Sequence, residues 1–399
     1  MDAQSGTPEN GWQERLDVLL LDATWGAGHR QAARAVREAL LEAAPGLRVG
    51  QVDGMEMVGH LFNRGVGDIY IAMLRHAPWS YGLFYHRTGF LRDDSPWQKF
   101  LNRLGRNHLL SLVRSLRPRV AVCTFPVPAG VLVHLRRGGL IDVPVVTVIT
   151  DYTVHSQWVH PGTALYCVGS EEVRESLLAR GEPEEVVRVT GIPVRDAFRP
   201  HSPEERARLR RALGLRPERP TLLVTGGAFG ALAAVAAVAE RLLRFDPELQ
   251  LLLVAGRDRR LKERLKALVA AVPGARRRAR VFGFTDAMPR LMAASDLVVT
   301  KAGGLTTAEA LAAGVPPLIY RPIPGQEEAN AAWLLRRQAG IVAREPEELE
   351  EQVRRLLAEP ERLEALRRAA RAAGRPGSAR RVAAEVLRLA GLADPATRP

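Results

Sequence analysis

Residues 296–330 read DLVVTKAGGLTTAEALAAGVPPLIYRPIPGQEEAN, and this stretch decides the fold. A short apolar run at residues 297–299 is followed by two glycines. A helical pattern then begins near Thr306 and stops at Gly314. This order predicts a buried strand, a glycine turn and a helix, which is the repeating unit of doubly wound α/β domains.

The glycine turn and the loop after the next strand form a candidate site for a nucleotide diphosphate. A helix N-terminus presents unpaired N–H groups and partial positive charge, and glycines let a phosphate approach the backbone. Glu309 stays near the helix mouth, where its carboxylate can accept hydrogen bonds from two ribose hydroxyls. The alternative is an ordinary turn in which Glu309 only favours the helix dipole. The candidate residues are Gly303, Gly304, Leu305, Thr306, Glu309, Gln326, Glu327 and Asn330.

The same pattern opens the chain. An apolar strand at residues 18–21 leads into a turn that ends at Gly28, and residues 31–43 have helical periodicity. His29 lies at the mouth of this helix, where a neutral imidazole can take a proton from an acceptor hydroxyl. The alternative is a capping or core histidine. Residues 222–227 repeat the pattern once more and end in Gly226 and Gly227.

Residues 300–330 resemble the donor-binding segment of family 28 glycosyltransferases, and among them the diacylglycerol glycosyltransferases. The run TDYTVHSQWVHPG at residues 150–162 is similar to a pattern of these enzymes, and GIPVR at residues 191–195 is similar to a family motif near the hinge. The resemblance implies the GT-B fold, with two Rossmann-like doubly wound domains facing a central cleft. It covers roughly residues 17–343.

The resemblance also implies roles for individual residues. His29 would be the catalytic base, with Asp151 orienting or assisting it. Arg195 would contact the diphosphate, although it could equally be a surface arginine. A metal site formed by Asp151, His155 and His160 is a minor alternative, because the family does not require a dedicated metal. Further implied contacts are Gly28 and Gly227 with the donor, the backbone near Phe284 and Thr285 with uracil, Gln326 and Glu327 with the sugar, and His155 and Trp158 with the acceptor.

Residues 61–108 are rich in aromatic and basic side chains, including Trp79, Tyr81 and Phe84. Aromatic rings favour the bilayer interface and basic residues favour an anionic surface. This segment is therefore expected to contact the membrane and the lipid acceptor. The alternatives are a helical hairpin with an aromatic core and, much less favoured, a surface for single-stranded nucleic acid.

Composition narrows the class of partner. The chain of 399 residues has 57 basic and 44 acidic residues, a formal charge of +13. This charge favours an anionic lipid surface or a phosphorylated substrate, and no zinc-finger, RNP or KH signature supports nucleic acid. Part of the charge can also reflect an arginine-rich proteome. Cys123 and Cys167 lie in apolar runs and are expected to be reduced core residues. Without a signal core or a long apolar run, the chain is expected to be cytoplasmic and peripheral to the inner face of the membrane.

Three segments are expected: an acceptor domain at 1–200, a UDP-sugar donor domain at 201–375, and a C-terminal helix at 376–399 that packs back onto the first domain. The charged, proline-bounded residues 200–220 are expected to be the linker.

The expected activity is inverting transfer of a hexose from UDP-glucose or UDP-galactose to diacylglycerol, with glucose favoured and no permanently bound cofactor. The alternatives are a polyprenyl-diphosphate-linked acceptor and a nucleotide-sugar sensor without turnover. A dinucleotide-dependent dehydrogenase is rejected because residues 26–29 lack the rest of its glycine fingerprint.

Overall fold

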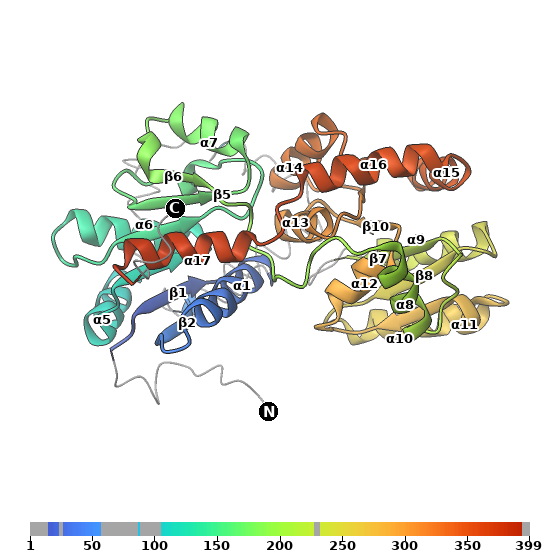
Figure 1. Ribbon diagram of the computed structural model, residues 1–399, viewed down its shortest axis with the longest axis horizontal. Helices are drawn as coiled ribbons and strands as arrows, with labels where there is room; N and C mark the ends of the chain where they lie inside the picture. The colour runs from blue at the N-terminus through green and yellow to red at the C-terminus, as the bar shows by residue number, and fades with distance from the viewer. Residues whose placement is uncertain (1–14, 24–26, 57–86, 88–104, 227–231, 393–399) are drawn as a thin grey trace. The chain divides into compact units, whose positions relative to one another are not determined.

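The computed structural model describes residues 15–23, 27–56, 87, 105–226 and 232–392. The chain divides into two compact units (Figure 1). The first comprises Met1–Arg195 together with Gly377–Pro399, and the second comprises Asp196–Pro376. Each unit is built around one six-stranded sheet in which every strand pairing is parallel.

The sheet of the first unit has the order β2-β1-β3-β4-β5-β6. Its strands are short and largely buried, as expected for a parallel sheet that is covered on both faces. They are β1 Val18–Asp22, β2 Val49–Asp53, β3 Val120–Cys123, β4 Val145–Val148, β5 Leu165–Val168 and β6 Val187–Val189. The helices are α1 Ala27–Ala43, α5 Arg106–Leu116, α6 Pro126–Arg137, α7 Glu171–Leu178 and α17 Ser378–Leu389, with short 3-10 turns η2 Ser156–Trp158 and η3 Glu184–Val186.

Alternate residues of β1 point into two different cores. Val18 and Leu20 pack with α1 and α17, whereas Leu19 and Leu21 pack with α5 and α6. This alternation follows from the two-residue period of a strand. The helices therefore cover both faces of the sheet, and its carboxyl edge is the place where loops can form a site.

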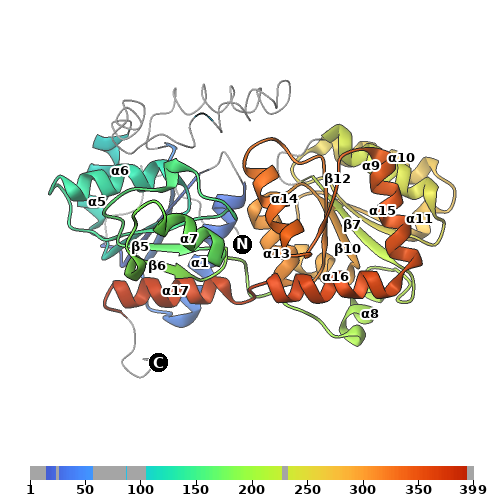
Figure 2. The same ribbon diagram turned by 90° about the horizontal axis from the view of Figure 1, so that it is seen from above.

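Helix α17 belongs to the first unit although it follows the whole second unit in sequence. It lies along α1 (Figure 2), and its buried residues Val382, Ala383 and Val386 join the core of the sheet. The Ser378 hydroxyl accepts a hydrogen bond from the Val194 N–H at 3.1 Å, and the Arg381 guanidinium donates to the Thr190 carbonyl at 2.8 Å. These bonds fix the segment that leads to Arg195, the last residue before the second unit.

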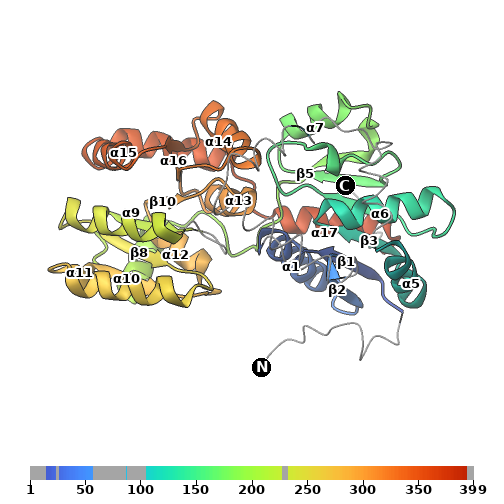
Figure 3. The same cartoon turned by 180° about the vertical axis from the view of Figure 1, so that it is seen from behind.

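The sheet of the second unit has the order β12-β11-β10-β7-β8-β9. Helices α9, α10 and α15, which Figure 3 labels in this unit, contribute apolar side chains to the core on one face of the sheet. The strands are β7 Thr221–Thr225, β8 Gln250–Val254, β9 Ala279–Phe282, β10 Leu297–Thr300, β11 Pro317–Tyr320 and β12 Ile341–Ala343. The helices are α8 Pro203–Ala212, α9 Leu232–Phe245, α10 Arg259–Ala271, α11 Ala275–Arg278, α12 Met288–Ala294, α13 Gly304–Ala312, α14 Gln326–Arg336, α15 Pro346–Ala358 and α16 Pro360–Ala373.

The expected linker at residues 200–220 is wrong, because this segment contains α8, a helix of the second unit. Ser202 and Glu205 form a reciprocal capping box at its start. Arg206 and Arg210 of α8 donate to the Asp296 carboxylate at 2.6 and 2.7 Å, and Arg367 of α16 donates to it as well. Burial raises the pKa of Asp296, but the three guanidinium groups outweigh it and hold this pKa below its ordinary value. Asp296 thus ties two helices to the amino end of β10.

The predicted fold class, two doubly wound α/β domains, is confirmed. Both cysteines are buried and free, as expected for core residues. Burial raises the pKa of the Cys167 thiol to about 12. No helix in the described part of the chain is long and apolar enough to cross a membrane.

Candidate functional site

In the first unit, the candidate site lies at the carboxyl edge of the sheet. His29 is in the first turn of α1, the helix that follows β1 in sequence. Thr124 directly follows β3, and Thr150 lies just past β4. Because β1 pairs with β2 on one side and β3 on the other, the strand order reverses here. Open α/β sheets bind ligands at such a reversal.

The His29 imidazole is held by two oxygen atoms. Its Nδ1 lies 2.7 Å from the Thr124 carbonyl oxygen and 3.0 Å from the Thr150 hydroxyl oxygen. The Thr124 hydroxyl donates in turn to the His29 carbonyl at 2.9 Å. Thr124 therefore fixes both the backbone and the side chain of His29.

This geometry determines which ring nitrogen carries the proton. A carbonyl oxygen only accepts, so the short contact with Thr124 requires a proton on Nδ1. In a neutral imidazole, Nε2 then holds the lone pair. Burial lowers the pKa of His29 to about 4, which outweighs the opposite effect of the Thr124 hydrogen bond. At neutral pH, His29 is an uncharged imidazole with Nε2 as its proton acceptor.

Two aromatic rings pack against His29. Phe125 meets it edge to face at 5.0 Å between ring centroids, and the Trp158 ring lies 6.2 Å away, tilted by 47°. Trp158 is buried. The structure therefore brings Trp158, predicted at the acceptor site, next to the predicted base.

Two histidines of the loop after β4 take part in hydrogen bonds with residues close to them in sequence. The His155 ring caps η2 by accepting from the Gln157 N–H at 3.3 Å. The backbone of His160 exchanges hydrogen bonds with the Tyr166 hydroxyl, and both His155 and His160 are buried. Asp151, the predicted partner of His29, is partly buried at the start of this loop. The contacts that fix Nδ1 are those with Thr124 and Thr150.

A buried acidic pair anchors the helix that carries His29. Asp22 and Asp53 end the paired strands β1 and β2 and lie opposite each other in register. Arg30 approaches both carboxylates at 3.5 Å, and the Gln51 amide donates to Asp22 at 2.6 Å. Burial raises the pKa of Asp22 above its ordinary value, against the opposing effects of Gln51 and Arg30. This network fixes the first turn of α1 relative to the sheet.

In the second unit, the glycine turn after β10 lies beside β7, where the strand order of this sheet reverses. Gly303 is the N-cap of α13, and a side chain at its position would meet no atom within 4 Å. The Asn330 side chain is fully buried and donates to the Ala302 carbonyl at 2.9 Å. Asn330 thus fixes the shape of the turn, and the open N-terminus of α13 provides N–H groups for an anion.

Lys301, at the same turn, forms an ion pair that the sequence analysis did not identify. Its ammonium lies 2.9 Å from a Glu327 carboxylate oxygen, and the other oxygen accepts from the Ile323 N–H at 3.1 Å. Glu327, predicted to bind sugar hydroxyls, therefore also joins the two loops of the site. Gly325, two residues before Glu327, has a φ of 103°, a conformation that favours glycine.

The other predicted donor residues lie on the same edge of the second sheet. Leu305, Thr306 and Glu309 are on α13, with Thr306 and Glu309 partly exposed, and Gln326 starts α14. Phe284 follows β9 and is 48% exposed, with the Arg257 guanidinium 4.8 Å above its ring. The Thr285 hydroxyl accepts from the Ala287 N–H at 3.1 Å, so this loop has a fixed start.

Two further predicted residues lie in the first unit, and four lie outside the residues that the structure describes. Gly28 lies in α1 next to His29, and Arg195 is partly buried at the end of the first unit. Gly227 and the predicted membrane residues Trp79, Tyr81 and Phe84 lie outside the described residues. Within the described ranges, no three His, Cys, Asp or Glu side chains are grouped to hold a metal ion.

Solved structures with this architecture define the fold as GT-B. MurG from Acinetobacter baumannii matches with a TM-score of 0.59 and 17% identity, over 93% of this chain and 99% of the other. Anabaena HepE in complex with UDP and glucose matches with a TM-score of 0.51 and 15% identity, over 94% and 98%. At such identities the likeness is one of fold.

Sequence comparisons show the family. A model described as monogalactosyldiacylglycerol (MGDG) synthase matches residues 29–194, and one described as glycosyltransferase family 28 C-terminal domain matches residues 221–382. The processive diacylglycerol beta-glucosyltransferase of Bacillus subtilis (strain 168) is 31% identical over 88% of this chain and 89% of its own length. That of Bacillus cereus (strain AH187) is 29% identical over 93% of each. The chain belongs to glycosyltransferase family 28, and the predicted resemblance is confirmed.

Proposed function

We propose that the protein transfers glucose from UDP-glucose to the free hydroxyl of diacylglycerol and forms a β-glucosyldiacylglycerol. The names of the relatives, at about 30% identity over most of the chain, favour diacylglycerol as acceptor and glucose as sugar. The same names make a second transfer to the first product part of the proposal. Galactose is the other sugar to be tested, because the family model of the first half is described as an MGDG synthase.

The observation that carries the proposal is the fixed, neutral imidazole of His29. Its Nδ1–H is directed at the Thr124 carbonyl and the Thr150 hydroxyl, so Nε2 is available to a hydroxyl group. Burial keeps its pKa near 4, so the ring is uncharged at neutral pH and the lone pair of Nε2 is free. A neutral imidazole suits attack by an alcohol, because a hydroxyl group must lose its proton when it forms the new bond. The free hydroxyl of diacylglycerol is such a group.

The proposed reaction is a single displacement. Nε2 of His29 takes the proton of the acceptor hydroxyl while its oxygen forms a bond to the anomeric carbon. The bond from that carbon to the diphosphate oxygen breaks, and its electron pair leaves with UDP. One displacement inverts the configuration, so an α-linked sugar nucleotide yields a β-glycoside. Asp151 lies at the start of the same loop as Trp158. It would assist His29 through the bound acceptor.

On the donor side, the N-terminus of α13 would stabilise the negative charge of the departing diphosphate. Lys301 adds a cation at the same turn, and Arg195 is proposed as a second contact. Glu309 would accept from the ribose hydroxyls, and the backbone near Phe284 and Thr285 would contact uracil. Gln326 and Glu327 would bind sugar hydroxyls, with Asn330 fixing the turn.

Diacylglycerol resides in a bilayer, so the protein must work at a membrane surface. We place it at the inner face of the cell membrane, as a peripheral protein of the cytoplasm. Residues 61–108, with their interleaved aromatic and basic side chains, are the proposed membrane contact of the acceptor side.

The test is release of UDP from UDP-glucose and from UDP-galactose, each with and without diacylglycerol in neutral detergent micelles. We expect release from UDP-glucose that depends on the lipid and gives a glycolipid. Lipid-dependent release only from UDP-galactose would replace the sugar in the proposal. No lipid-dependent release from either donor, with UDP still bound, would refute diacylglycerol as acceptor and favour a polyprenyl-diphosphate-linked acceptor or a sensor.

A further inference from the structure

The positive charge of the chain is concentrated in one part of the second unit. Residues 256–281 contain ten arginines and lysines and two acidic residues, a net +8 of the chain's +13. This segment comprises α10, α11 and most of β9. A general arginine bias would spread the charge along the chain, so this concentration calls for a local explanation.

Helix α10 has one apolar face and one basic face. Leu261, Leu265 and Val269 are buried against the sheet, at the spacing of one helix face. The opposite face is exposed. It carries Arg259, Arg260, Arg264 and Lys266 together with Glu263, and towards its end the small residues Ala267, Ala270 and Ala271.

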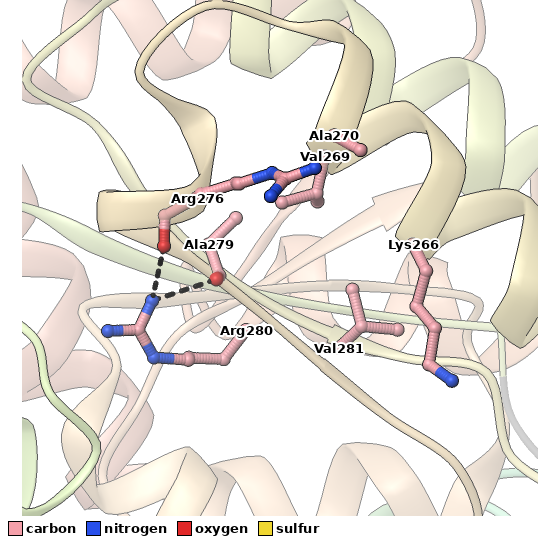
Figure 4. Close-up of a pocket in the computed structure, with 7 residues that line it drawn as sticks. All are labelled: Lys266, Val269, Ala270, Arg276, Ala279, Arg280 and Val281. Atoms are coloured by element: carbon pink, nitrogen blue, oxygen red, sulfur yellow. Dashed lines mark hydrogen bonds between the residues drawn. The ribbon is translucent and has the colours of Figure 1, made fainter.

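A shallow, open pocket of about 420 Å³, called the cavity below, lies at the end of this face, between α10, α11 and β9. Lys266, Arg276 and Arg280 line it, and Figure 4 shows the Arg280 guanidinium turned towards the Arg276 and Ala279 carbonyls, on the side away from Lys266. The Arg280 guanidinium is held by the carbonyls of Leu213, Gly214, Arg276 and Ala279 at 2.6 to 3.1 Å. Among the described residues, neither Arg276 nor Arg280 is paired with a carboxylate. Arg276 and Arg280 therefore bring positive charge to the cavity that is not paired with a carboxylate of the described residues.

We propose that this basic surface, formed by the exposed face of α10 with α11 and the adjoining cavity, binds anionic lipid, and that the cavity holds a lipid phosphate. Guanidinium groups match phosphate oxygens in charge and geometry. Lys266 adds a third cation beside them, although it also contacts Glu263 at 2.9 Å.

A lipid surface fits these residues better than a nucleic acid. Residues 256–281 contain no aromatic side chain, so they offer no ring on which a base can stack. The small apolar residues beside the cationic ones suit the headgroup region of a bilayer. The inference deepens the proposed function, because an enzyme that takes its acceptor from a bilayer gains from a second contact on its donor unit.

Vesicle binding by the full chain tests the inference, with phosphatidylcholine vesicles compared with vesicles that also contain phosphatidylglycerol. Each basic residue at an anionic surface contributes about fivefold to the partition coefficient. Fivefold for each residue sets the minimum, so the double variant Arg264→Gln/Arg276→Gln should bind phosphatidylglycerol vesicles at least about 25-fold more weakly, and more if Arg276 also holds a lipid phosphate. The control Arg336→Gln/Arg368→Gln removes two exposed arginines of α14 and α16 in the same unit and should bind like the wild type.

The single variants test the cavity itself. A phosphate held in the cavity makes Arg276→Gln more damaging than Arg264→Gln, whereas equal losses would overturn the headgroup site. Equal weakening by the control pair would overturn the whole surface. Tighter binding to single-stranded RNA than to anionic vesicles would replace lipid by nucleic acid.

Turnover in neutral micelles separates this inference from the proposed function. The Arg264→Gln/Arg276→Gln enzyme should keep wild-type turnover there, because neither residue lies in the catalytic or donor site. A wild-type protein that binds anionic vesicles but transfers no sugar in micelles would refute the proposed function alone. A wild-type enzyme that transfers sugar but does not prefer anionic vesicles would refute the lipid surface alone.

Discussion

Replacing Thr150 by valine tests whether the contacts of His29 Nδ1 matter for catalysis. Valine has nearly the same shape as threonine but cannot accept the hydrogen bond that the Thr150 hydroxyl accepts from Nδ1–H at 3.0 Å. One such bond contributes about 0.5–1.5 kcal/mol net. The Thr124 carbonyl at 2.7 Å remains, so the ring keeps one acceptor. We therefore expect kcat to fall about 2- to 12-fold.

The assay is initial-rate UDP release with diacylglycerol micelles, with kcat and the KM for UDP-glucose measured separately. Thr150 orients the base and belongs to the first unit, whereas the proposed donor turn belongs to the second. The KM for UDP-glucose should therefore stay unchanged. Thr150→Ser keeps the hydroxyl and should restore kcat.

The chain also provides a matched control three residues away. The Thr147 hydroxyl in β4 is buried and has no hydrogen-bond partner among the described residues. Thr147→Val therefore makes the same chemical change without removing a contact, and it should leave kcat unchanged. Equal rates for Thr150→Val, Thr147→Val and the wild type would refute the role of Thr150 in holding His29.

Four further predictions concern the pH dependence of activity and of stability, donor binding, and the contribution of Asp296 to stability. Because burial lowers the pKa of His29 to about 4, kcat/KM should stay level from pH 8 to about pH 5 and fall only towards pH 4. A fall in kcat/KM centred on 6.5, the ordinary pKa of histidine, would contradict the lowered pKa. The same shift means that, between pH 6.5 and pH 4, the unfolded chain binds a proton that the folded chain does not. The free energy of unfolding, measured with urea, should therefore fall as the pH falls from 6.5 towards 4. Glu309→Ala should weaken UDP binding by about 1.5–3 kcal/mol in calorimetry, and an unchanged affinity would remove Glu309 from the ribose site. Asp296→Asn leaves Arg206, Arg210 and Arg367 without their shared carboxylate and should lower the free energy of unfolding by about 3 kcal/mol, whereas exposed Glu361→Gln should not.

The sequence was sufficient for the fold because the strand, glycine turn and helix pattern is local. The apolar run at residues 297–299 became β10, and the glycines after it became the cap of α13. The helix begins at Gly304, two residues before the expected start, because Gly303 is extended and serves as the N-cap. The position of His29 at the start of α1 followed from the same local pattern.

The linker expected at residues 200–220 was wrong for a physical reason. Charged residues and prolines are typical of linkers, but Pro203 here occupies the first turn of a helix, where its missing N–H costs nothing. Ser202 and Glu205 had the spacing of a capping box, and that signal was present in the sequence. Arg206 and Arg210 are paired with Asp296, which is some 90 residues away in sequence and offsets part of their charge.

The partners of His29 could not be assigned from the sequence. Thr124 and Thr150 lie 95 and 121 residues from His29. They meet it only because β3 lies between β1 and β4 in the sheet, an order that the chain does not reveal locally. The pairing of Lys301 with Glu327 depends in the same way on the neighbouring strands β10 and β11. Polar residues directly after parallel strands were the available signal, since those ends meet at one edge.

A labelling experiment tests whether His29 acts as the base in sugar transfer to diacylglycerol. Incorporation of labelled glucose from UDP-glucose into lipid is followed for the wild type and for His29→Gln, with UDP affinity measured on the same preparations. The account predicts a labelled β-glucosyldiacylglycerol from the wild type, and a rate lower by about 100-fold or more for the variant at unchanged UDP affinity. Equal incorporation by both proteins, or none by the wild type, would contradict it.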